Sequence, residues 1–444
     1  MSEYKSDISG WLVRRATWHL WVVVVAVLGA LAGRTARVTS DGGMDNAIVV
    51  RAARGWLAGG SPYDDPHFLY LPSAVLAAVP QVLVPPAVLG VLVPVGVVGC
   101  LVGGWGCALR LHGVALRSRF AALGLIGLAV GFAPFAHLVL LGNWTATAVL
   151  ALPLGLLLAG RGRWVAAGVV FGAAVALKPL LAPVGLLFVF AGRWRGVGVM
   201  AGVPVVASVG AALVLPDPAG FLTRTLPFLL RGDDGFVRLY EASPVAVLPR
   251  VGVPVAVAGG IGVVAAGVGV VCAYLRWRRG GGGPLRLSET AAMLMLSAFL
   301  VSRPSYDHYL LVVVPVLVAG LPREGAVVRG VWFWLAMVPQ LPGVSWPYLE
   351  AVERRAFRDA VTLCGLAVAV AVGCLRSARV FSPPPPLPVP SSRGSAPSTP
   401  PVAPPLNPTG GSAPGPPGDG PPTHPTRSAR RLDSGASGAG GVGE

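Results

Sequence analysis

Residues 251–275 read VGVPVAVAGGIGVVAAGVGVVCAYL and contain no charged side chain. This length and composition is typical of a helix that crosses a membrane, which needs about 20 predominantly apolar residues. A similar run at residues 18–33 reads WHLWVVVVAVLGALAG, and further apolar runs alternate along the chain with short clusters of arginine. The sequence therefore predicts an all-α, polytopic integral membrane protein.

The composition of the whole chain excludes a set of soluble domains. Of 444 residues, 54% are hydrophobic and 12% are charged, against roughly 25% charged in an ordinary soluble protein. The net charge of +16 does not indicate nucleic-acid binding, because the arginines lie between apolar runs without interleaved aromatic side chains or a basic soluble domain. The five cysteines form no CxxC pair, so neither a disulfide framework nor a zinc site is supported.

The charges of the loops predict the topology, because cytoplasmic loops carry an excess of Lys and Arg. Residues 1–17 are predicted to be a cytoplasmic N-terminus before a retained signal anchor. Residues 18–381 are predicted to form one membrane domain with about ten to twelve crossings and both ends inside. Three segments are expected outside, at about residues 34–70, 216–250 and 302–308, and acids balance the arginines in the first two.

The rest of the chain narrows the kind of chemistry that is expected. Residues 382–444 are rich in Pro, Gly and Ser, which predicts a disordered cytoplasmic tail. The motifs of P-loop nucleotide binding, zinc proteases and α/β-hydrolases are absent from the sequence. Any chemistry is therefore expected in the outer loops, on a substrate that reaches them from the membrane.

A broken helix is predicted at the centre of residues 164–191. This apolar run has a pair of arginines before it and another after it, so both of its ends are expected inside. Lys178-Pro179 interrupts it, because proline does not continue a helix cleanly, and broken helices at membrane depth are tolerated where they line a polar cavity. Lys178 is suited to hold a phosphate group. The alternative is a lysine that snorkels to the membrane surface.

The first outer loop holds a second candidate, Asp45. Residues 48–57 place apolar side chains on one face of a helix and Arg51 and Arg54 on the other, which predicts an amphipathic helix lying on the outer bilayer surface. Asp45 stands at the start of this helix. Spacing alone favours a helix N-cap, with a catalytic carboxylate as the alternative.

Two further polar clusters carry less weight on their own. Arg303, Asp307 and His308 mark a short outer turn between two apolar runs, and such a turn requires some polar residues in any case. Asp64 and Asp65 are adjacent in a turn bounded by proline. We expect them to be solvated rather than to bind a metal.

Five motifs occur in a consistent order. Residues 45–63 follow the pattern D-x3-V-x2-A-A-x3-L-x-G-x-x-P-Y, and residues 68–72 follow F-x-Y-x-P. Residues 142–145 read GNWT, residues 166–195 contain a Lys-Pro pair before an Arg-Trp-Arg cluster, and residues 302–310 read SRPSYDHYL. Together they resemble the polyprenyl-phosphate-mannose-dependent α-mannosyltransferases of glycosyltransferase family 87, in the GT-C class of membrane glycosyltransferases.

The resemblance covers about residues 40–320 and implies a GT-C-type fold with Asp45 as the general base. It also implies donor-phosphate and substrate contacts for Lys178, His308, Arg303, Tyr63, Tyr70 and Asn143. It requires no metal or cofactor. The chain departs from the family pattern at Asn143 and Thr145, where that family tends to have G-Q-x-N, and at Tyr309, which replaces a second histidine.

The favoured hypothesis is an inverting glycosyltransferase of the bacterial plasma membrane with its site on the extracytoplasmic face. It would transfer a sugar, mannose by resemblance, from a polyprenyl-phosphate donor to a glycolipid or lipoglycan acceptor. A transporter or lipid flippase of the envelope is the main alternative, because broken helices and buried cations are equally natural there. A scaffold that recruits partners through the Pro-rich tail and an inactive family member are two others.

Overall fold

The computed structural model describes residues 10–39, 41–231, 240–279, 283–343 and 351–377. Within these ranges the chain is built from helices and has no strand, with one isolated bridge between Arg15 and Ser118. The all-α prediction is confirmed. The predicted tail at residues 382–444 lies outside the described residues.

The helices run along the chain in the following order. The α-helices are α2 (Trp18–Val38), α3 (Met44–Leu57), α4 (Pro72–Val82), α5 (Pro86–Leu111), α6 (Arg119–Gly131), α7 (Ala133–Leu141), α8 (Thr145–Gly160), α9 (Trp164–Leu177), α10 (Gly185–Phe190), α11 (Trp194–Ala212), α12 (Leu226–Arg231), α14 (Pro244–Val247), α15 (Val255–Arg279), α16 (Pro284–Val301), α17 (Leu310–Val318), α18 (Val331–Met337) and α19 (Ala351–Ser377). Short helical turns include η1 (Pro62–Asp64), η2 (Pro179–Val184), η3 (Phe221–Thr225) and η5 (Asp307–Tyr309).

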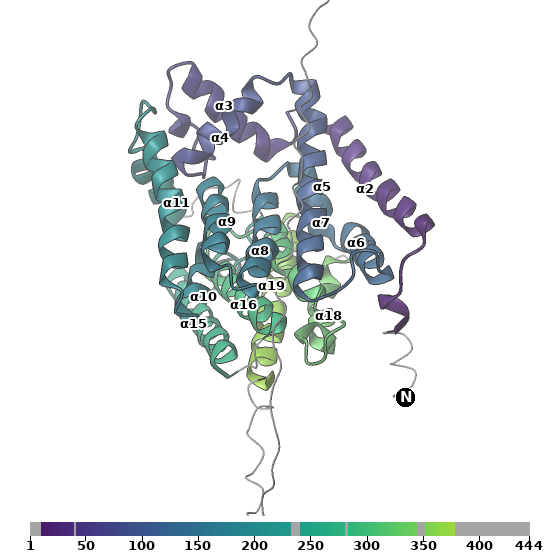
Figure 1. Cartoon of the computed structure of the whole chain (residues 1–444). Coiled ribbons are helices and arrows are strands. Elements are labelled where there is room, and N and C mark those ends of the chain that lie inside the picture. The colour runs from purple at the N-terminus through teal and green to yellow at the C-terminus, as the bar shows by residue number, and fades with distance from the viewer. Residues whose placement is uncertain (1–9, 40, 232–239, 280–282, 344–350, 378–444) are drawn as a thin grey trace, which may run out of the picture. The chain divides into compact units, whose positions relative to one another are not determined.

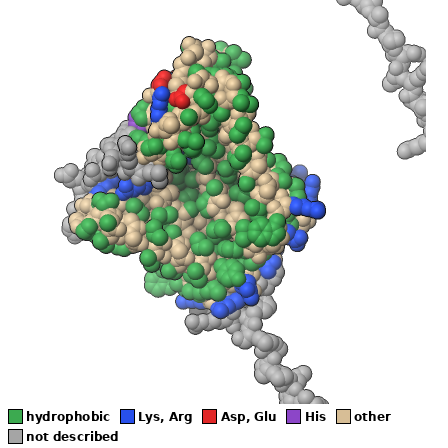
Figure 2. Space-filling view, turned by 90° about the vertical axis from the view of Figure 1, so that its left-hand side faces the viewer, with side chains coloured by type: hydrophobic (Ala, Val, Ile, Leu, Met, Phe, Trp, Pro, Cys, Tyr) green, Lys and Arg blue, Asp and Glu red, His purple; other side chains and the backbone are tan. Residues whose placement is uncertain are grey.

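Six of the described helices are long and apolar enough to span a membrane: α2, α5, α11, α15, α16 and the part of α19 from Arg354 to Arg376. The other predicted crossings fall on shorter or broken helices, among them α8, α9 and α17. The chain is thus a polytopic membrane protein. Apolar side chains cover much of the face in Figure 2, where the Lys and Arg side chains gather at the edges.

One predicted span is not continuous. The sequence favours a single crossing near residues 120–140, but α6 and α7 meet at a bend of 73°. Phe132 between them is extended, and Pro134 lies in the first turn of α7. Proline is tolerated in a first turn because the N–H that it lacks has no partner within the helix there. Pro134 therefore starts a new helix instead of continuing α6.

The break predicted at Lys178-Pro179 is confirmed. α9 ends at Leu177, Lys178 is extended, and the chain continues as η2 and then α10. The two halves of the predicted hairpin are therefore short helices that meet at the lysine.

Glycines allow the central helices to approach closely. A Cβ atom at Gly168 in α9 would lie 2.7 Å from the Gly196 carbonyl oxygen in α11, and one at Gly104 in α5 would lie 2.5 Å from the Val149 carbonyl oxygen in α8. Small residues at helix contacts are typical of membrane proteins, where association depends on close packing. Because α8 also contacts α9, these helices form a row from α5 through α8 and α9 to α11 (Figure 1).

α3 and α4 lie across one end of this row (Figure 1). The amphipathic α3 was expected to lay its apolar face on the bilayer. Instead Val49 and Ala53 are fully buried in a cluster that includes residues of α4, and α3 packs on α4. The expectation about this face is wrong, because a neighbouring helix of the protein covers the apolar stripe.

Candidate functional site

Asp45 lies in the first turn of α3, after the helix has already begun. The N-cap residue is Gly43, so Asp45 does not cap the helix. Its half-buried carboxylate instead accepts a hydrogen bond from Asn143 Nδ2 at 2.5 Å. The N-cap interpretation is therefore wrong. Position in the first turn still favours a carboxylate, because the helix dipole stabilises negative charge there.

Asn143 lies in the short loop between α7 and α8, and a close backbone contact holds this loop against the start of α3. Gly142 is left-handed, with φ of 62°, and a Cβ atom there would lie 2.1 Å from the Gly42 carbonyl oxygen. A Cβ at Gly43 would lie 2.5 Å from the Leu141 carbonyl oxygen. Only glycine permits this approach, which brings Asn143 to Asp45.

Lys178 completes a chain of hydrogen bonds. Its Nζ donates to Asn143 Oδ1 at 3.0 Å and to Thr145 Oγ1 at 2.9 Å. Asn143 is 3% exposed and Thr145 is fully buried. The ammonium also lies 4.9 Å from the Tyr309 ring centroid and 5.8 Å from that of Tyr70, within the range of cation–π attraction. Carboxylate, amide and ammonium thus form one fixed polar group, and no snorkelling is needed to satisfy the lysine.

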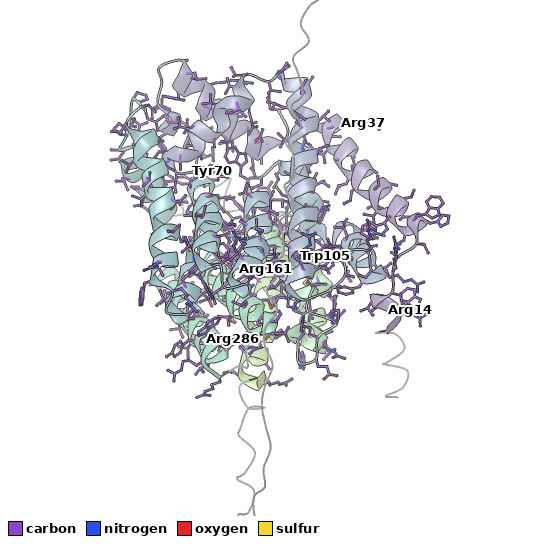
Figure 3. The ribbon with its side chains drawn as sticks, in the orientation of Figure 1. Arg14, Arg37, Tyr70, Trp105, Arg161 and Arg286 are labelled. Carbon is purple, nitrogen blue, oxygen red and sulfur yellow. The ribbon has the colours of Figure 1, made fainter. Side chains whose placement is uncertain are left out.

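A cavity of about 310 Å³ opens beside this group. Asp45, Asn143 and Lys178 form its polar wall, and much of the remainder is apolar or aromatic, including Tyr70 and Tyr309. Figure 3 shows Tyr70 toward the end of the bundle that carries α3 and α4. A mostly apolar cavity with a few convergent polar groups is the usual form of a small-molecule site.

Arg303 supplies a second cation to the same cavity. Its Nη2 donates to the Val245 carbonyl oxygen at 2.8 Å, which holds the side chain beside the turn before η5. Tyr306 of this turn also lines the cavity, and burial raises the pKa of its hydroxyl. Tyr306 is therefore neutral at physiological pH and available as a hydrogen-bond donor.

His308 is adjacent to the cavity but does not line it. The side chain is 2% exposed, and its ring stacks on that of Tyr306 at a centroid distance of 5.4 Å. Neither ring nitrogen has a hydrogen-bond partner among the described residues, and Nδ1 lies 3.4 Å from Asp307 Oδ1. In this structure His308 supports the aromatic wall of the cavity.

Tyr63 lies farther from the cavity. It packs in an aromatic cluster against Phe68 and Phe221, with ring centroid distances of 5.5 and 6.5 Å. Burial, followed by the negative charge of Asp217, raises the pKa of its hydroxyl. Tyr70 therefore lines the cavity, whereas Tyr63 is packed in the aromatic cluster with Phe68 and Phe221.

Asp64 and Asp65 form ion pairs that connect surface segments. Asp64 pairs with Arg224 at 2.6 Å, and Asp65 pairs with Arg51 at 3.5 Å. The expectation that they are merely solvated is therefore incomplete. Among the described residues no group of three or more His, Cys, Asp or Glu side chains is arranged to hold a metal.

The sequence profile of glycosyltransferase family 87 matches residues 68–302, more than half of the chain. The chain belongs to glycosyltransferase family 87. The family 87 match contains Tyr70, Asn143 and Lys178, while Asp45 and His308 lie outside it.

Two curated relatives of this family 87 chain carry the name alpha-(1->3)-arabinofuranosyltransferase. They come from the CDC 1551 and H37Rv strains of Mycobacterium tuberculosis, and each is 28% identical over 231 residues, 51% of this chain and 53% of the relative. The chain thus spans about half the length of the curated relatives it matches. Their name does not support the predicted specificity for mannose. No solved structure matches the chain significantly.

Two sets of polar contacts in this family 87 chain were not predicted from the sequence. Trp144 Nε1 donates to Asn46 Oδ1 at 3.0 Å, which fixes the residue next to Asp45. Asp307 hydrogen-bonds to His137 and lies 3.4 Å from Arg355. His137 stands alone in an apolar run, so no local pattern indicates its acidic partner.

Proposed function

We propose that the chain is an inverting membrane glycosyltransferase that uses a polyprenyl-phosphate-linked sugar donor and a glycolipid or lipoglycan acceptor. Membership of glycosyltransferase family 87 supports the reaction class. The observation that carries the proposal is the hydrogen-bond chain from Asp45 through Asn143 to Lys178 on the wall of one cavity. A base for the acceptor and a cation for the leaving group are thus presented to the same small volume.

In the proposed reaction, one side chain accepts the proton of the acceptor and two others stabilise the charge on the leaving phosphate. Asp45 takes the proton from the acceptor hydroxyl as its oxygen attacks the anomeric carbon of the donor sugar. The bond from that carbon to the phosphate oxygen breaks, and polyprenyl phosphate leaves with the electron pair. One well-placed carboxylate is enough for general-base catalysis. The ammonium of Lys178 and the guanidinium of Arg303 stabilise the charge that develops on the phosphate.

Two sugars are candidates for the group that the donor carries. Mannose follows from the resemblance of the loop motifs, and arabinofuranose from the name of the curated relatives. Both fit the proposed chemistry, because attack at the anomeric carbon and departure of the phosphate are the same. We propose mannose first and arabinofuranose second.

The site is proposed to face the extracytoplasmic side of the bacterial cell membrane. The loops expected outside contribute Asp45, Tyr70 and Arg303, and the structure gathers them at one cavity. The loops and helix ends that are rich in arginine contribute Arg161 and Arg286 to a different cavity. An excess of arginine is typical of the cytoplasmic side.

The test uses membrane vesicles that contain the full chain. Polyprenyl-phosphate donors labelled in mannose or in arabinofuranose are added with an envelope glycolipid fraction, and both labelled glycolipid and free polyprenyl phosphate are measured. We expect the two products in equal amounts from one donor. Donor that crosses the vesicle membrane unchanged, with no product, would favour a transporter and contradict the proposal.

The Pro-rich tail is tested in the same assay. Deletion of residues 382–444 is expected to leave the transfer rate unchanged, because no residue proposed for the chemistry lies there. Loss of transfer at equal protein level would favour the scaffold alternative.

A further inference from the structure

A second cavity, of about 580 Å³, lies where the ends of several helices meet. Residues from α5, α9, α10, α15 and α16 contribute to it, and none of its described lining residues is acidic. Figure 3 shows Arg286 of this cavity at the end of the bundle opposite Tyr70. The proposed transfer mechanism does not use this cavity.

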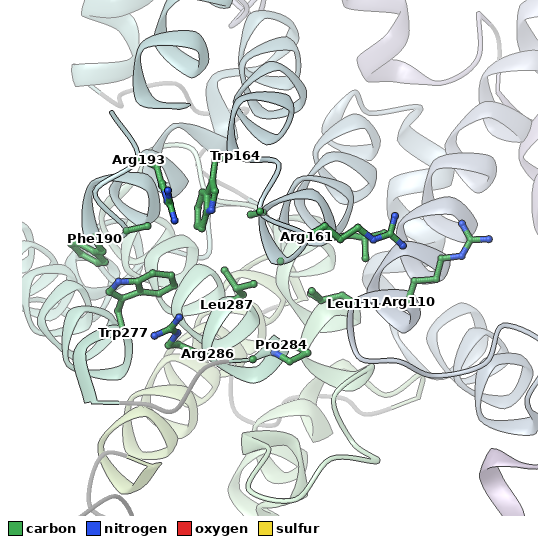
Figure 4. Close-up of a pocket in the computed structure, with 16 residues that line it drawn as sticks. Arg110, Leu111, Arg161, Trp164, Phe190, Arg193, Trp277, Pro284, Arg286 and Leu287 are labelled. Carbon is green, nitrogen blue, oxygen red and sulfur yellow. The ribbon is translucent and has the colours of Figure 1, made fainter. Parts of the chain in front are cut away.

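Two arginines and two tryptophans form a ladder along one side of this second cavity (Figure 4). The Arg193 guanidinium carbon lies 5.8 Å from the Trp164 ring centroid, and that of Arg286 lies 4.3 Å from the Trp277 centroid. The two indole rings meet edge to face at 6.4 Å. Such contacts hold the guanidinium groups in place and leave their N–H donors available, because an aromatic face accepts no strong hydrogen bond.

The positive charge of the ladder has no acidic partner among the described residues of the cavity wall. Glu289, three residues after Arg286, is engaged elsewhere: it pairs with Arg276 at 2.8 Å and accepts the Val327 amide at 3.0 Å. The Arg286 Nε is buried without a hydrogen-bond partner among the described residues. Arg110 and Arg161 add further positive charge on the other side of the cavity (Figure 4).

We propose that this second cavity binds the phosphate headgroup of an anionic membrane phospholipid. Guanidinium groups match phosphate oxygens with paired donors. Tryptophan is enriched at the depth of the lipid headgroups, because its ring is amphipathic: the N–H edge contacts water and the rest contacts apolar groups. Loop topology alone accounts for the presence of arginines here, but not for a cavity in which they alternate with indole rings.

The lipid site is separate from the transfer site. α9 connects them, with Trp164 at its first residue and Lys178 directly after its last. A helix of 14 residues is about 21 Å long at 1.5 Å per residue. A headgroup held by Arg193 therefore does not contact Lys178, and lipid binding is expected to be independent of the donor.

The experiment measures binding to the purified full chain in a zwitterionic detergent. The probes are phosphatidylglycerol, phosphatidylcholine and inorganic phosphate, each followed by native mass spectrometry. We expect saturable binding of phosphatidylglycerol alone. Equal binding of phosphatidylcholine, or inorganic phosphate bound as tightly as the lipid, would overturn the assignment to an anionic phospholipid.

A matched pair of variants localises the binding. Arg193→Gln/Arg286→Gln is expected to weaken phosphatidylglycerol binding roughly tenfold to thirtyfold, at about 1 kcal/mol per basic residue. Arg117→Gln/Arg279→Gln removes the same charge from exposed residues that do not line the cavity and is expected to bind normally. Equal weakening in both variants would show a diffuse charge effect and overturn the site.

A folding defect is distinguished by a third variant. Arg193→Lys/Arg286→Lys keeps the charge and is expected to bind better than the glutamine pair but less well than wild type, because lysine lacks the guanidinium fork. Thermal unfolding in lipid-free detergent is measured for all variants. Binding by the lysine pair as weak as that of the glutamine pair, at normal thermal stability, would contradict a phosphate-headgroup site.

Discussion

The Lys178 ammonium lies 3.0 Å from the side-chain oxygen of Asn143, and the nitrogen of the same amide donates to Asp45. An amide is suited to this place because it accepts at one end and donates at the other. The bridge fixes the orientation of the carboxylate and keeps the lysine beside the cavity. Without it, the two charges would be free to move together and neutralise each other.

Asn143→Leu is expected to lower kcat about 10- to 100-fold, since a hydrogen bond to a charged group contributes about 1.5–3 kcal/mol. The substitution keeps the approximate shape and removes the bonds to Asp45 and Lys178, together with the bond that Asn143 Oδ1 accepts from the Thr145 amide. The donor KM should change little, because Asn143 orients the base rather than holding the sugar. Steady-state transfer kinetics measure both values, and an unchanged kcat would contradict a role for the bridge.

Lys178→Met is expected to lower kcat by a factor on the order of 100 to 1,000, the usual effect of losing one preorganised charge-stabilising group. Lys178→Arg should not restore it, because Thr145 and Asn143 are packed too closely around the ammonium for a planar guanidinium. Transfer assays on both variants test this. Full activity of the arginine variant would mean that charge alone suffices.

Gly142→Ala is expected to reduce activity at least about tenfold, because loss of alignment by even 1 Å has effects of that order or larger. The new Cβ would lie 2.1 Å from the Gly42 carbonyl oxygen and separate Asp45 from Asn143. Gly162→Ala is the matched control, with φ of 77° and no heavy atom within 4 Å of its Cβ. Equal loss in both variants would assign the effect to backbone strain.

Glu289→Leu is expected to destabilise the fold by about 3–5 kcal/mol, because it leaves Arg276 buried without its partner. The double variant Arg276→Met/Glu289→Leu should recover most of this loss, since it removes both charges. Thermal unfolding in detergent compares the three proteins. A double variant less stable than Glu289→Leu would contradict the assignment.

The features that follow from local sequence were largely predictable. Long apolar runs fix α5 and α15, and the Lys178-Pro179 pair fixes the break after α9, because each depends on neighbouring residues only. The bend between α6 and α7 also had a local signal in Pro134. It was missed because the apolar run continues across it.

Five of the residues named from the sequence line one cavity, namely Asp45, Tyr70, Asn143, Lys178 and Arg303, but their arrangement was not predictable. Asp45, Asn143 and Lys178 come from three distant segments, so no periodicity indicates that one amide connects the two charges. The same limit hid the pairing of Asp307 with His137 and Arg355. The residues that line a cavity depend on how helices pack, and neither composition nor motif spacing fixes that.

The most direct test of the catalytic proposal compares Asp45→Asn with Asp64→Asn in the transfer assay at equal protein levels. Both remove one carboxylate from the segment of residues 34–70, but Asp64 is exposed and, among the described residues, forms its ion pair with surface Arg224. We expect Asp45→Asn to lose about 100- to 10,000-fold in kcat, the range for a general base, and Asp64→Asn to stay near wild type. Transfer that survives Asp45→Asn would contradict Asp45 as the base.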